Sequence, residues 1–383
     1  MQKIAIIGRE KLLAYAETET VFGSIIKLGE DAVLFDSNSS VGIDTFGSVI
    51  KIAEVVDTLD NETASMVDKI SQYLIDRFGS TRVNSIDFGV SIYGLSMGDK
   101  QYQRMLINTK KALKAQSIKC RFVTPKNMQL NAAQIHHNGL LKNGVEILIV
   151  QDKNNYYLAR TVAVQDIDAY TKRDFGRPNR NMKVGMFPPK LAQSMINLAE
   201  PQTNTTIYDP FCGSGVVLQE SALRSLPAWG SDISGEMIEA TTQNIAWLEK
   251  EFNLSANTEV FEADATTISN CPPLPYSIVT EGFLGTMLSN APSVDQLSKL
   301  ETELSKLYLD FFINLSKLSS APQSVVITLP CWQTKDGIKK LNIIDQIIKL
   351  GYTIKQFESV ESLNLIYKRP DQIVGRQILV CKL

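Results

Sequence analysis

The chain has 383 residues, enough for two or three domains, and it is 44% hydrophobic and 21% charged, as is usual for folded globular proteins. No apolar run reaches the roughly 18 residues that cross a membrane, and the N-terminus lacks the pattern of a signal peptide. The five cysteines are scattered without paired spacing, so the sequence predicts neither a disulfide framework nor a metal site and favours a reducing, cytoplasmic location.

The net charge of −2 hides an uneven distribution. No Asp or Glu occurs between Lys100 and Gly144, a segment rich in basic residues that include Lys110 and Lys114. A second basic cluster contains Arg173, Arg177, Arg180 and Lys183. Basic segments of this kind favour a polyanionic partner, although a helix face with solvated lysines is the alternative.

In the first half, hydrophobic periodicity predicts two small α+β units, residues 1–95 and residues 96–167. The first unit is expected to contain strands at 3–8, 31–37, 48–56 and 85–95, and helices at 9–23 and 64–79. The second is expected to contain helices at 100–117 and 130–141, and strands at 119–125, 145–152 and 156–166.

Residues 168–189, with adjacent Pro188 and Pro189, are interpreted as an ordered linker. The remainder, 190–383, alternates between helix and strand periodicity. Helices are expected at 190–199, 216–226, 235–250, 295–319 and 336–350, and strands at 205–209, 228–232, 258–263, 276–281 and 323–329, with further strands near the C-terminus. This alternation predicts an α/β fold with a doubly wound, mostly parallel sheet.

A short glycine-containing turn, Phe-Cys-Gly-Ser-Gly, connects strand 205–209 to the following helix and predicts a nucleotide-like cofactor at the strand ends. A P-loop needs Lys-Ser/Thr after the last glycine, and Gly215 is followed by valine. A dinucleotide fingerprint needs a third glycine where Leu218 stands. S-adenosylmethionine remains, and Gly213 and Gly215 let the backbone approach its methionine part.

Three carboxylates follow successive strands, at Asp209, Asp232 and Asp264. The first suits a ligand that carries a sulfonium and an ammonium, the second can accept both ribose hydroxyls, and the third can accept the adenine amino group. Phe211 and Ala265 are their neighbours in the expected cofactor site. Helix N-capping is the alternative role for each aspartate taken singly.

Three segments carry a family resemblance. YDPFCGSGVVLQESA resembles motif I of amino-group methyltransferases that act on nucleic acids. The segment from Val162 to Ala199 resembles the linker and first helix of the Trm11-type tRNA guanosine-N2 methyltransferases, and the tail KRPDQIVGRQILV resembles the same family. The two front units more weakly resemble its N-terminal ferredoxin-like domain and its THUMP domain. The resemblance implies a Rossmann-type class I methyltransferase that methylates guanosine N2 in tRNA, most simply at position 10.

The fourth motif departs from the family pattern Asp-Pro-Pro-Tyr and reads IVTEGFLG at 278–285. Either Thr280 takes the place of the acid with Phe283 in the place of tyrosine, or Glu281 takes the place of the acid in a shorter loop. The second alignment is favoured, because an exocyclic amine needs hydrogen-bond acceptors to become nucleophilic. Glu281 and the Gly282 carbonyl would accept from the amine, and Phe283 would stack on the base.

The expected partner is tRNA, with its target base flipped out of the helix. Arg173, Arg177, Arg180 and Lys183 would contact its phosphates, as would Lys110 and Lys114, unless these charges simply face solvent. The sequence leaves open whether a small activating subunit is needed. The alternatives are an amino methyltransferase acting on DNA or another RNA, and a non-catalytic RNA-binding protein with a retained cofactor fold.

Overall fold

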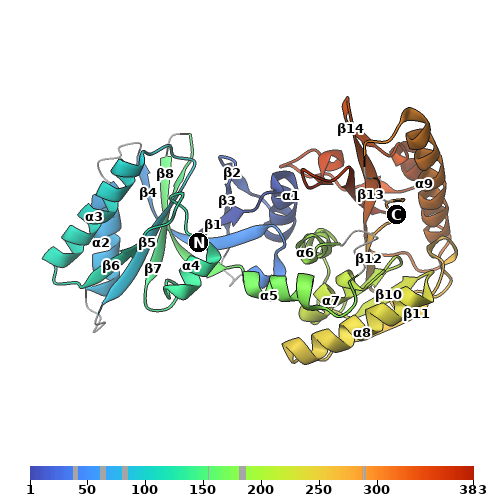
Figure 1. The fold of residues 1–383 in the computed structure, drawn as a ribbon, viewed down its shortest axis with the longest axis horizontal. Coiled ribbons are helices and arrows are strands. Elements are labelled where there is room, and N and C mark those ends of the chain that lie inside the picture. Colours follow the sequence, from blue (N-terminus) through green and yellow to red (C-terminus); the bar gives the residue numbers. More distant parts are fainter. Residues whose placement is uncertain are drawn as a thin grey trace. The chain divides into compact units, whose positions relative to one another are not determined.

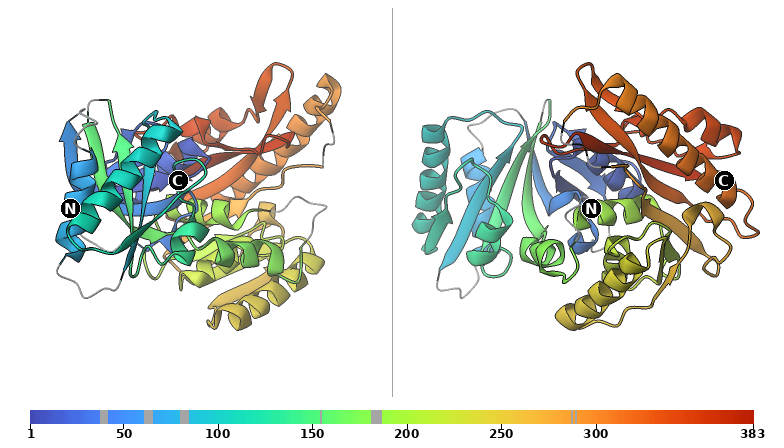
Figure 2. Two further views of the ribbon diagram at one scale, coloured as in Figure 1. Left: turned by 60° about the vertical axis from the view of Figure 1, so that its left-hand side comes forward. Right: turned by 45° about the vertical axis from the view of Figure 1, so that its right-hand side comes forward.

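The computed structural model describes residues 1–37, 42–60, 66–79, 85–153, 155–180, 187–286, 288 and 290–383. It divides into two compact units, which Figures 1 and 2 colour along the sequence. Unit 1 comprises Met1–Lys11, Phe22–Asp44 and Val49–Ile167, and unit 2 comprises Leu12–Val21, Thr45–Ser48 and Asp168–Leu383. Within the described ranges, no helix combines the length and the apolarity that a membrane span requires.

Unit 1 contains one mixed sheet. Its strands are β1 (Gln2–Ile7), β2 (Ile26–Leu28), β3 (Ala32–Asp36), β4 (Val49–Asp60), β5 (Ile86–Tyr93), β6 (Cys120–Val123), β7 (Val145–Gln151) and β8 (Asn155–Val164). Their order is β2-β3-β1-β4-β8-β7-β5-β6. Because β5 pairs with both β6 and β7, strands from both sides of residue 95 share this sheet, and the two front units expected from the sequence form one unit.

Helices pack on both faces of this sheet (Figure 1). They are η1 (Ile43–Thr45), α2 (Met66–Phe78), α3 (Asp99–Ala115) and α4 (Ala132–His137). Buried residues recur at helical spacing in α3, as at Tyr102, Leu106 and Leu113, and this apolar stripe packs with α2, β5 and β7. The shorter α4 contributes Ala132 and Ile135 to a separate apolar cluster.

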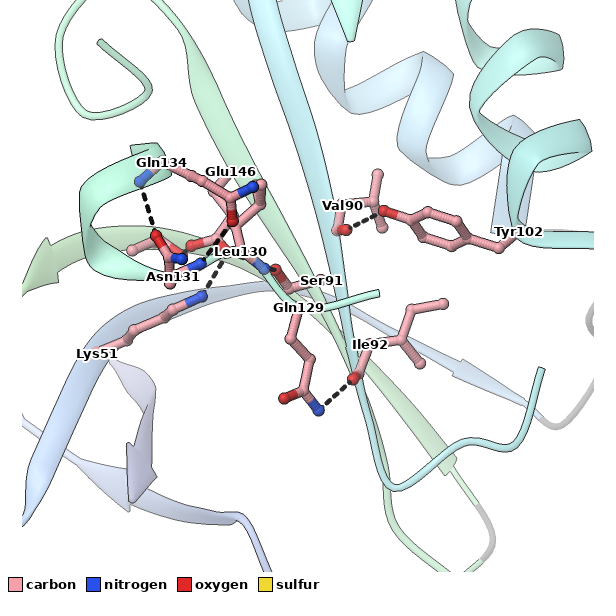
Figure 3. Close-up of polar contacts among 11 residues, drawn as sticks. Lys51, Val90, Ser91, Ile92, Tyr102, Gln129, Leu130, Asn131, Gln134 and Glu146 are labelled. Atoms are coloured by element: carbon pink, nitrogen blue, oxygen red, sulfur yellow. Dashed lines mark hydrogen bonds and ion pairs between the residues drawn. The ribbon is translucent and has the colours of Figure 1, made fainter. Parts of the chain in front are cut away.

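A buried ion pair joins two strands of this sheet (Figure 3). Lys51 on β4 and Glu146 on β7 are 3% and 0% exposed, with 2.6 Å between Nζ and Oε1. Ser91 donates to the same oxygen, and Thr161 donates to Oε2 at 2.6 Å. Burial lowers the pKa of Lys51, an effect that Glu146 opposes. Glu146 therefore has a partner for each oxygen in a region without water contact.

Unit 2 contains a second sheet. Its strands are β9 (Thr206–Asp209), β10 (Ala228–Asp232), β11 (Thr258–Glu262), β12 (Tyr276–Glu281), β13 (Val325–Thr334), β14 (Gly337–Lys340), β15 (Thr353–Ile354), β16 (Ile366–Tyr367) and β17 (Val374–Lys382). The main order is β11-β10-β9-β12-β13-β17-β15, with β14 on β13 and β16 on β17. The first five strands of this order are parallel and β17 is antiparallel, as the predicted doubly wound sheet requires.

Unit 2 also contains helices from several parts of the chain. They are α1 (Lys11–Phe22), α5 (Ile167–Thr171), η3 (Lys172–Gly176), α6 (Pro189–Leu198), α7 (Val216–Leu223), α8 (Gly235–Phe252), η4 (Ala265–Thr267), α9 (Val294–Leu315), α10 (Ile344–Lys349) and η5 (Ser362–Asn364). Leu218 of α7 and Ile245 of α8 pack together on one face of the sheet. Helix α9 lies on the opposite face (Figure 1), where Tyr308 and Phe311 belong to a larger apolar cluster.

Helix α1 belongs mainly to unit 2 because it carries a fully buried carboxylate, Glu17. Glu17 accepts hydrogen bonds from the backbone N–H groups of Gly47 at 3.0 Å and Ser48 at 2.9 Å. It also accepts one from Asn197 of α6 at 2.7 Å. These bonds join α1 and residues 45–48 to α6, the helix that precedes the parallel strands.

Two expectations about the C-terminal region are wrong. The helix expected at 336–350 is instead the hairpin strand β14 followed by the short helix α10. Lys335 and Asp336 form the two-residue turn of this hairpin, and Gly337, which begins β14 opposite Thr334, has a positive φ of 115°. The strands expected near the C-terminus before β17 shrink to the two-residue segments β15 and β16.

Replacing Lys51 by methionine tests the buried ion pair of unit 1. We expect Lys51→Met to lower the free energy of unfolding by about 3–5 kcal/mol, because Glu146 is left as an unpaired buried charge. Urea unfolding, with hydrogen exchange of the β7 amides as a second readout, would measure the loss in the free energy of unfolding. The matched control is Lys69→Met, which removes the exposed pair with Asp57 and should cost less than about 1 kcal/mol. Equal effects of the two substitutions would contradict the assignment.

Candidate active site

A cavity of about 440 Å³ opens in unit 2 where β9, β10, β11 and β12 end. Asp209, Asp232, Asp264 and Glu281 all line it. Parallel strands bring their carboxyl ends to one edge of a sheet, which is where doubly wound folds bind ligands. The volume is suited to a ligand of nucleoside size, and the acidic lining favours a ligand that carries positive charge.

Asp209 is the most buried of these carboxyls, at 2% exposed. Its Oδ1 accepts hydrogen bonds from the Thr280 hydroxyl at 2.5 Å and from the Phe211 N–H at 3.2 Å. Burial raises the pKa of Asp209 to about 8, and the charges of Asp232 and Glu281 raise it further against these two hydrogen bonds. A cation that enters the cavity would favour the ionised form.

Asp232 accepts backbone hydrogen bonds with both oxygens. Gly213 donates to Oδ2 at 2.9 Å, and Ser234 donates to Oδ1 at 3.0 Å. Gly213 has a φ of 51°, and a Cβ at this position would meet open space, so its backbone faces the cavity without obstruction. These contacts fix the carboxylate beside the glycine turn at the end of the second strand, where a ribose acid was expected.

The third aspartate and its neighbour, Asp264 and Ala265, also line the cavity. Asp264 caps the short helix η4, since its Oδ1 accepts from the Thr266 N–H at 2.8 Å. Capping and ligand binding therefore share this side chain. Phe211 lines the cavity as well, and its ring packs edge-on against Phe311 of α9.

The expected cofactor role of Gly215 is corrected by the structure. Gly215 does not line the cavity, whereas Gly213 and Ser214 do. Its φ of 79° and the lack of a side chain serve packing instead, because a Cβ would lie 2.6 Å from Cγ2 of Thr241 on α8. The same Thr241 donates to the Gly213 carbonyl at 2.7 Å, so the two glycines form one rigid turn.

The Glu281-Gly282-Phe283 corner forms another wall of the cavity. Arg376 of β17 donates from Nε to Oε1 of Glu281 in a buried ion pair. The Tyr308 hydroxyl donates to the Phe283 carbonyl at 2.9 Å, and a Cβ on residue 282 would overlap the Tyr308 side chain. Gly282 therefore fits tightly against Tyr308, contrary to a loose loop. Phe283 itself is 48% exposed at the cavity and free to stack on a ligand.

Of the two alignments of the fourth motif, only one places an acid in the cavity. Thr280 is fully buried, does not line the cavity and holds Asp209 through its hydroxyl. The catalytic role considered for Thr280 is therefore corrected to one of positioning a carboxyl. Burial raises the pKa of Glu281, and the Arg376 charge and hydrogen bond oppose that rise.

The basic residues of the linker do not share one role. Arg173 is 5% exposed and its Nε lies 2.7 Å from Oε1 of Glu220, so the expectation that it faces RNA is wrong. Arg177 is 3% exposed, which also contradicts a solvent-facing contact. Arg180 is partly buried and stacks on the ring of Phe175. Lys183 lies outside the described residues.

The other predicted RNA contacts lie on α3 of unit 1. Lys114 is exposed, and the Nζ of Lys110 lies 5.4 Å from the ring centre of Phe122. Both residues remain candidates for phosphate contacts.

Sequence reasoning missed several residues that build the site. Arg376 and Tyr308 hold the Glu281 corner from β17 and α9, and Asn244 of α8 bonds to the carbonyls of Ser214 at 2.9 Å and Asn179 at 3.0 Å. Asn244 thereby ties the linker to the glycine turn. The C-terminal strand is buried without interruption from residue 375 to 381, so its one charged residue in that stretch, Arg376, could have been noticed, whereas Tyr308 and Asn244 carry no local signal.

Comparison with known proteins agrees with this geometry. Residues 177–330 match the UPF0020 family, described as an RMKL-like methyltransferase domain. A tRNA (guanine(10)-N2)-dimethyltransferase of Methanocaldococcus jannaschii is 27% identical over 173 residues, which cover 40% of this chain and 47% of that protein. The enzyme of the same name from Methanothermobacter thermautotrophicus is 32% identical over 100 residues, covering 26% of this chain and 28% of that protein. The matches thus span less than half the length of these relatives.

Solved structures show the same fold. The crystal structure of TrmN from Thermus thermophilus aligns with a TM-score of 0.53 at 13% identity, covering 100% of this chain and 99% of that chain. A possible methylase from Clostridium difficile 630 aligns with a TM-score of 0.50 at 12% identity, covering 99% and 97%.

Unit 2 thus has the Rossmann-type fold of these solved structures, and the sequence predicts S-adenosylmethionine as its cofactor. Within it, residues 177–330 match the UPF0020 methyltransferase domain. The residues present fit this cofactor, because the cavity is lined by acids that suit its sulfonium and ammonium and by a glycine turn that admits its methionine part.

Replacing Asp209 by asparagine tests the raised pKa. Between its ordinary value of 3.8 and about 8, the folded protein holds a proton that the unfolded chain has released, so this group's contribution to stability falls as the pH rises through that window. Asp209→Asn should therefore raise the free energy of unfolding at pH 9 by at least about 2 kcal/mol, and change it little at pH 4. Urea unfolding at both pH values measures this.

Asp232→Asn is the matched control for that substitution. Both oxygens of Asp232 accept backbone N–H groups, and an amide offers only one acceptor, so this variant should be destabilised at pH 9. A loss of stability in Asp209→Asn at pH 9, or an equal gain at pH 4, would show that the Asp209 carboxyl is not held in the state described.

Proposed function

We propose that the protein transfers a methyl group from S-adenosylmethionine to the exocyclic N2 of a guanosine in tRNA, most simply at position 10. The observation that carries the proposal is the cavity in which an acceptor, Glu281, and an exposed ring, Phe283, meet the carboxyls of Asp209 and Asp232. The names of the similar archaeal enzymes support the choice of tRNA and of N2.

In this proposal the cofactor is held by the ends of three strands. Asp232 accepts the ribose hydroxyls, and Asp264 with Ala265 contacts the adenine. Asp209 and the backbone of Gly213 face the methionine part, and Phe211 packs beside it. The affinity of the cavity for the cofactor's positive charge would come from these carboxyl groups, which line the same cavity.

The chemistry needs positioning more than it needs a tuned base. An exocyclic amine is a weak nucleophile because its lone pair is delocalised into the purine ring. Glu281 and the Gly282 carbonyl would each accept a hydrogen bond from an N–H group of the amine. These two hydrogen bonds would draw the nitrogen towards tetrahedral geometry and stabilise its developing positive charge. Phe283 stacks on the extruded base and aligns it with the methyl group. The C–N bond forms as the C–S bond breaks with its electron pair on sulfur, and the nitrogen then loses a proton to water.

The remaining regions would hold the tRNA. In the proposal, residues 1–95 are the counterpart of the ferredoxin-like domain and 96–167 that of the THUMP domain, and strands of both lie in the one sheet of unit 1. Residues 168–189 would then be the linker and 190–383 the methyltransferase domain. Lys110, Lys114 and Arg180 are the proposed phosphate contacts. The five cysteines are free thiols, which is consistent with the proposed cytoplasmic location.

Incubation of the protein with unmodified tRNA and S-adenosylmethionine, followed by mass spectrometry of the nucleosides, tests the proposal. We expect N2-methylated guanosine, and sequencing of the product should place it at one position. Phe283→Ala should lower kcat/KM by about 10- to 100-fold, because stacking on an aromatic ring contributes about 1–3 kcal/mol per base. Phe283→Tyr should keep most of the activity.

Ile348→Ala is the control, since Ile348 is also 48% exposed and lies away from the cavity lining. Methylation of duplex DNA in preference to tRNA would favour the amino methyltransferase alternative. Binding of tRNA without any methyl transfer, with or without added cell extract as a source of a small activating subunit, would favour a non-catalytic RNA-binding protein.

The basic face of α3 gives a separate prediction. Lys110→Glu combined with Lys114→Glu should weaken tRNA binding at least tenfold at 150 mM salt and reduce the slope of log affinity against log salt by about one to two. Filter binding at several salt concentrations measures both quantities. The affinity for S-adenosylmethionine should not change.

The control pair is Lys299→Glu with Lys349→Glu, at exposed positions of α9 and α10. If the two double variants lose equal affinity, the effect is one of net charge and α3 has no specific role in RNA binding.

A further inference from the structure

One contact of the cavity remains without a function, the buried ion pair between Glu281 and Arg376. Glu281 ends β12, and its register partner on the neighbouring strand β13 is Thr328. Arg376 lies on β17, opposite Pro330 of β13. The pair therefore reaches across β13, and the arginine is 3% exposed while the carboxylate faces the cavity.

The contact fixes one half of the carboxylate. Arg376 donates from Nε to Oε1 of Glu281, and within the described part of the chain we find no donor to Oε2. Arg376 is held in place by its strand, because β17 pairs with β13 from Val374 to Cys381. The carboxylate plane is thus set by the protein, and one oxygen remains for a donor that enters the cavity.

Two other titratable groups, Asp209 and Tyr308, lie near enough to Glu281 to interact with its charge. Asp209 at the end of β9 carries a second carboxyl, and its pKa is raised partly by the Glu281 charge. The Tyr308 phenol of α9 lies near enough that the Glu281 charge raises its pKa too. Arg376 on β17 is the one positive group that acts on Glu281 in this set, and it opposes the effect of burial. A buried carboxyl beside another carboxyl would take up a proton without such a partner.

We propose that Arg376 is the positioning residue of the methyl transfer, which keeps Glu281 charged and turns its Oε2 towards the exocyclic amine. This inference rests on the proposed function. Arg376 does not touch the substrate; it acts through the orientation and charge of the acceptor. This role would account for a glutamate where the family pattern Asp-Pro-Pro-Tyr has an aspartate, because the longer side chain of Glu281 reaches Arg376 on the antiparallel strand β17.

The pH dependence of kcat in four proteins tests the proposal: the wild type, Arg376→Gln, Arg376→Lys and Glu281→Gln. In Arg376→Gln we expect kcat at pH 7 to fall at least 30-fold while KM for tRNA changes less than threefold. The acidic limb of the profile should move to higher pH by one unit or more, so that activity partly returns at pH 9. Arg376→Lys should keep the limb near its original position and recover at least a third of the lost activity.

Glu281→Gln should lose activity at every pH, and adding Arg376→Gln to it should cost less than threefold more. A uniform loss in Arg376→Gln at all pH values, with no rescue by lysine, would mean that the arginine only supports the fold, and would overturn the proposal. The melting temperatures of the variants identify any loss of activity that comes from unfolding. If Arg376→Gln is unfolded, the pH profile of Arg376→Lys tests the proposal instead.

A binding measurement separates this proposal from the proposed function. The ratio of the affinities for S-adenosylmethionine and S-adenosylhomocysteine reports the negative charge near the sulfonium, without any RNA. If Arg376 keeps Glu281 charged, Arg376→Gln lowers this ratio at pH 7 about as much as Glu281→Gln does. If Glu281 stays charged without the arginine, the ratio rises and the proposal fails. If the wild type methylates no tRNA but Arg376→Gln still lowers the ratio relative to the wild type, the proposed function alone is refuted.

Discussion

The burial of several carboxyl groups at one edge of a parallel sheet is the constraint on which the site depends. Asp209 is almost without solvent contact and is close enough to Asp232 and Glu281 for their charges to raise its pKa. Such an arrangement costs free energy in the empty protein, because like charges in a low dielectric repel and are poorly solvated. A cationic ligand would relieve that cost. The feature that destabilises the protein without a ligand would therefore strengthen the binding of such a ligand.

The chain limits this cost with hydrogen bonds from neighbouring elements. Thr280 and the Phe211 N–H hold Asp209, two backbone N–H groups hold Asp232, and Arg376 pairs with Glu281. Each donor comes from a strand or turn of unit 2, so the acids are oriented before any ligand arrives. Preorganised groups of this kind contribute more to a reaction than groups that must first reorganise.

Much of the methyltransferase fold could be predicted from the sequence, because its strands carry continuous apolar runs bounded by turn residues. The predicted bounds 228–232 and 276–281 agree with β10 and β12. The expectation of a helix at 336–350 was wrong because the end of a hairpin turn at Lys335-Asp336 and the strand β14 after it were interpreted as part of that helix. The place of α1 in unit 2 depends on the bonds from Gly47, Ser48 and Asn197 to Glu17, and such long-range contacts leave no periodic signal.

The site was predictable in part for the same reason. Acids that follow successive strands meet at one edge by the geometry of a parallel sheet, so Asp209, Asp232, Asp264 and Glu281 could be named in advance. The roles of Arg173 and Gly215 could not, because an ion pair with Glu220 and a close approach to Thr241 both depend on packing between helices distant in sequence.

A crystal structure with bound S-adenosylhomocysteine tests the central claim most directly. The account predicts the ribose hydroxyls on Asp232, the adenine beside Ala265 and the sulfur facing the Glu281 corner, with Arg376 still bonded to Oε1. A ligand found outside this cavity, or one whose ribose does not reach Asp232, would contradict the account.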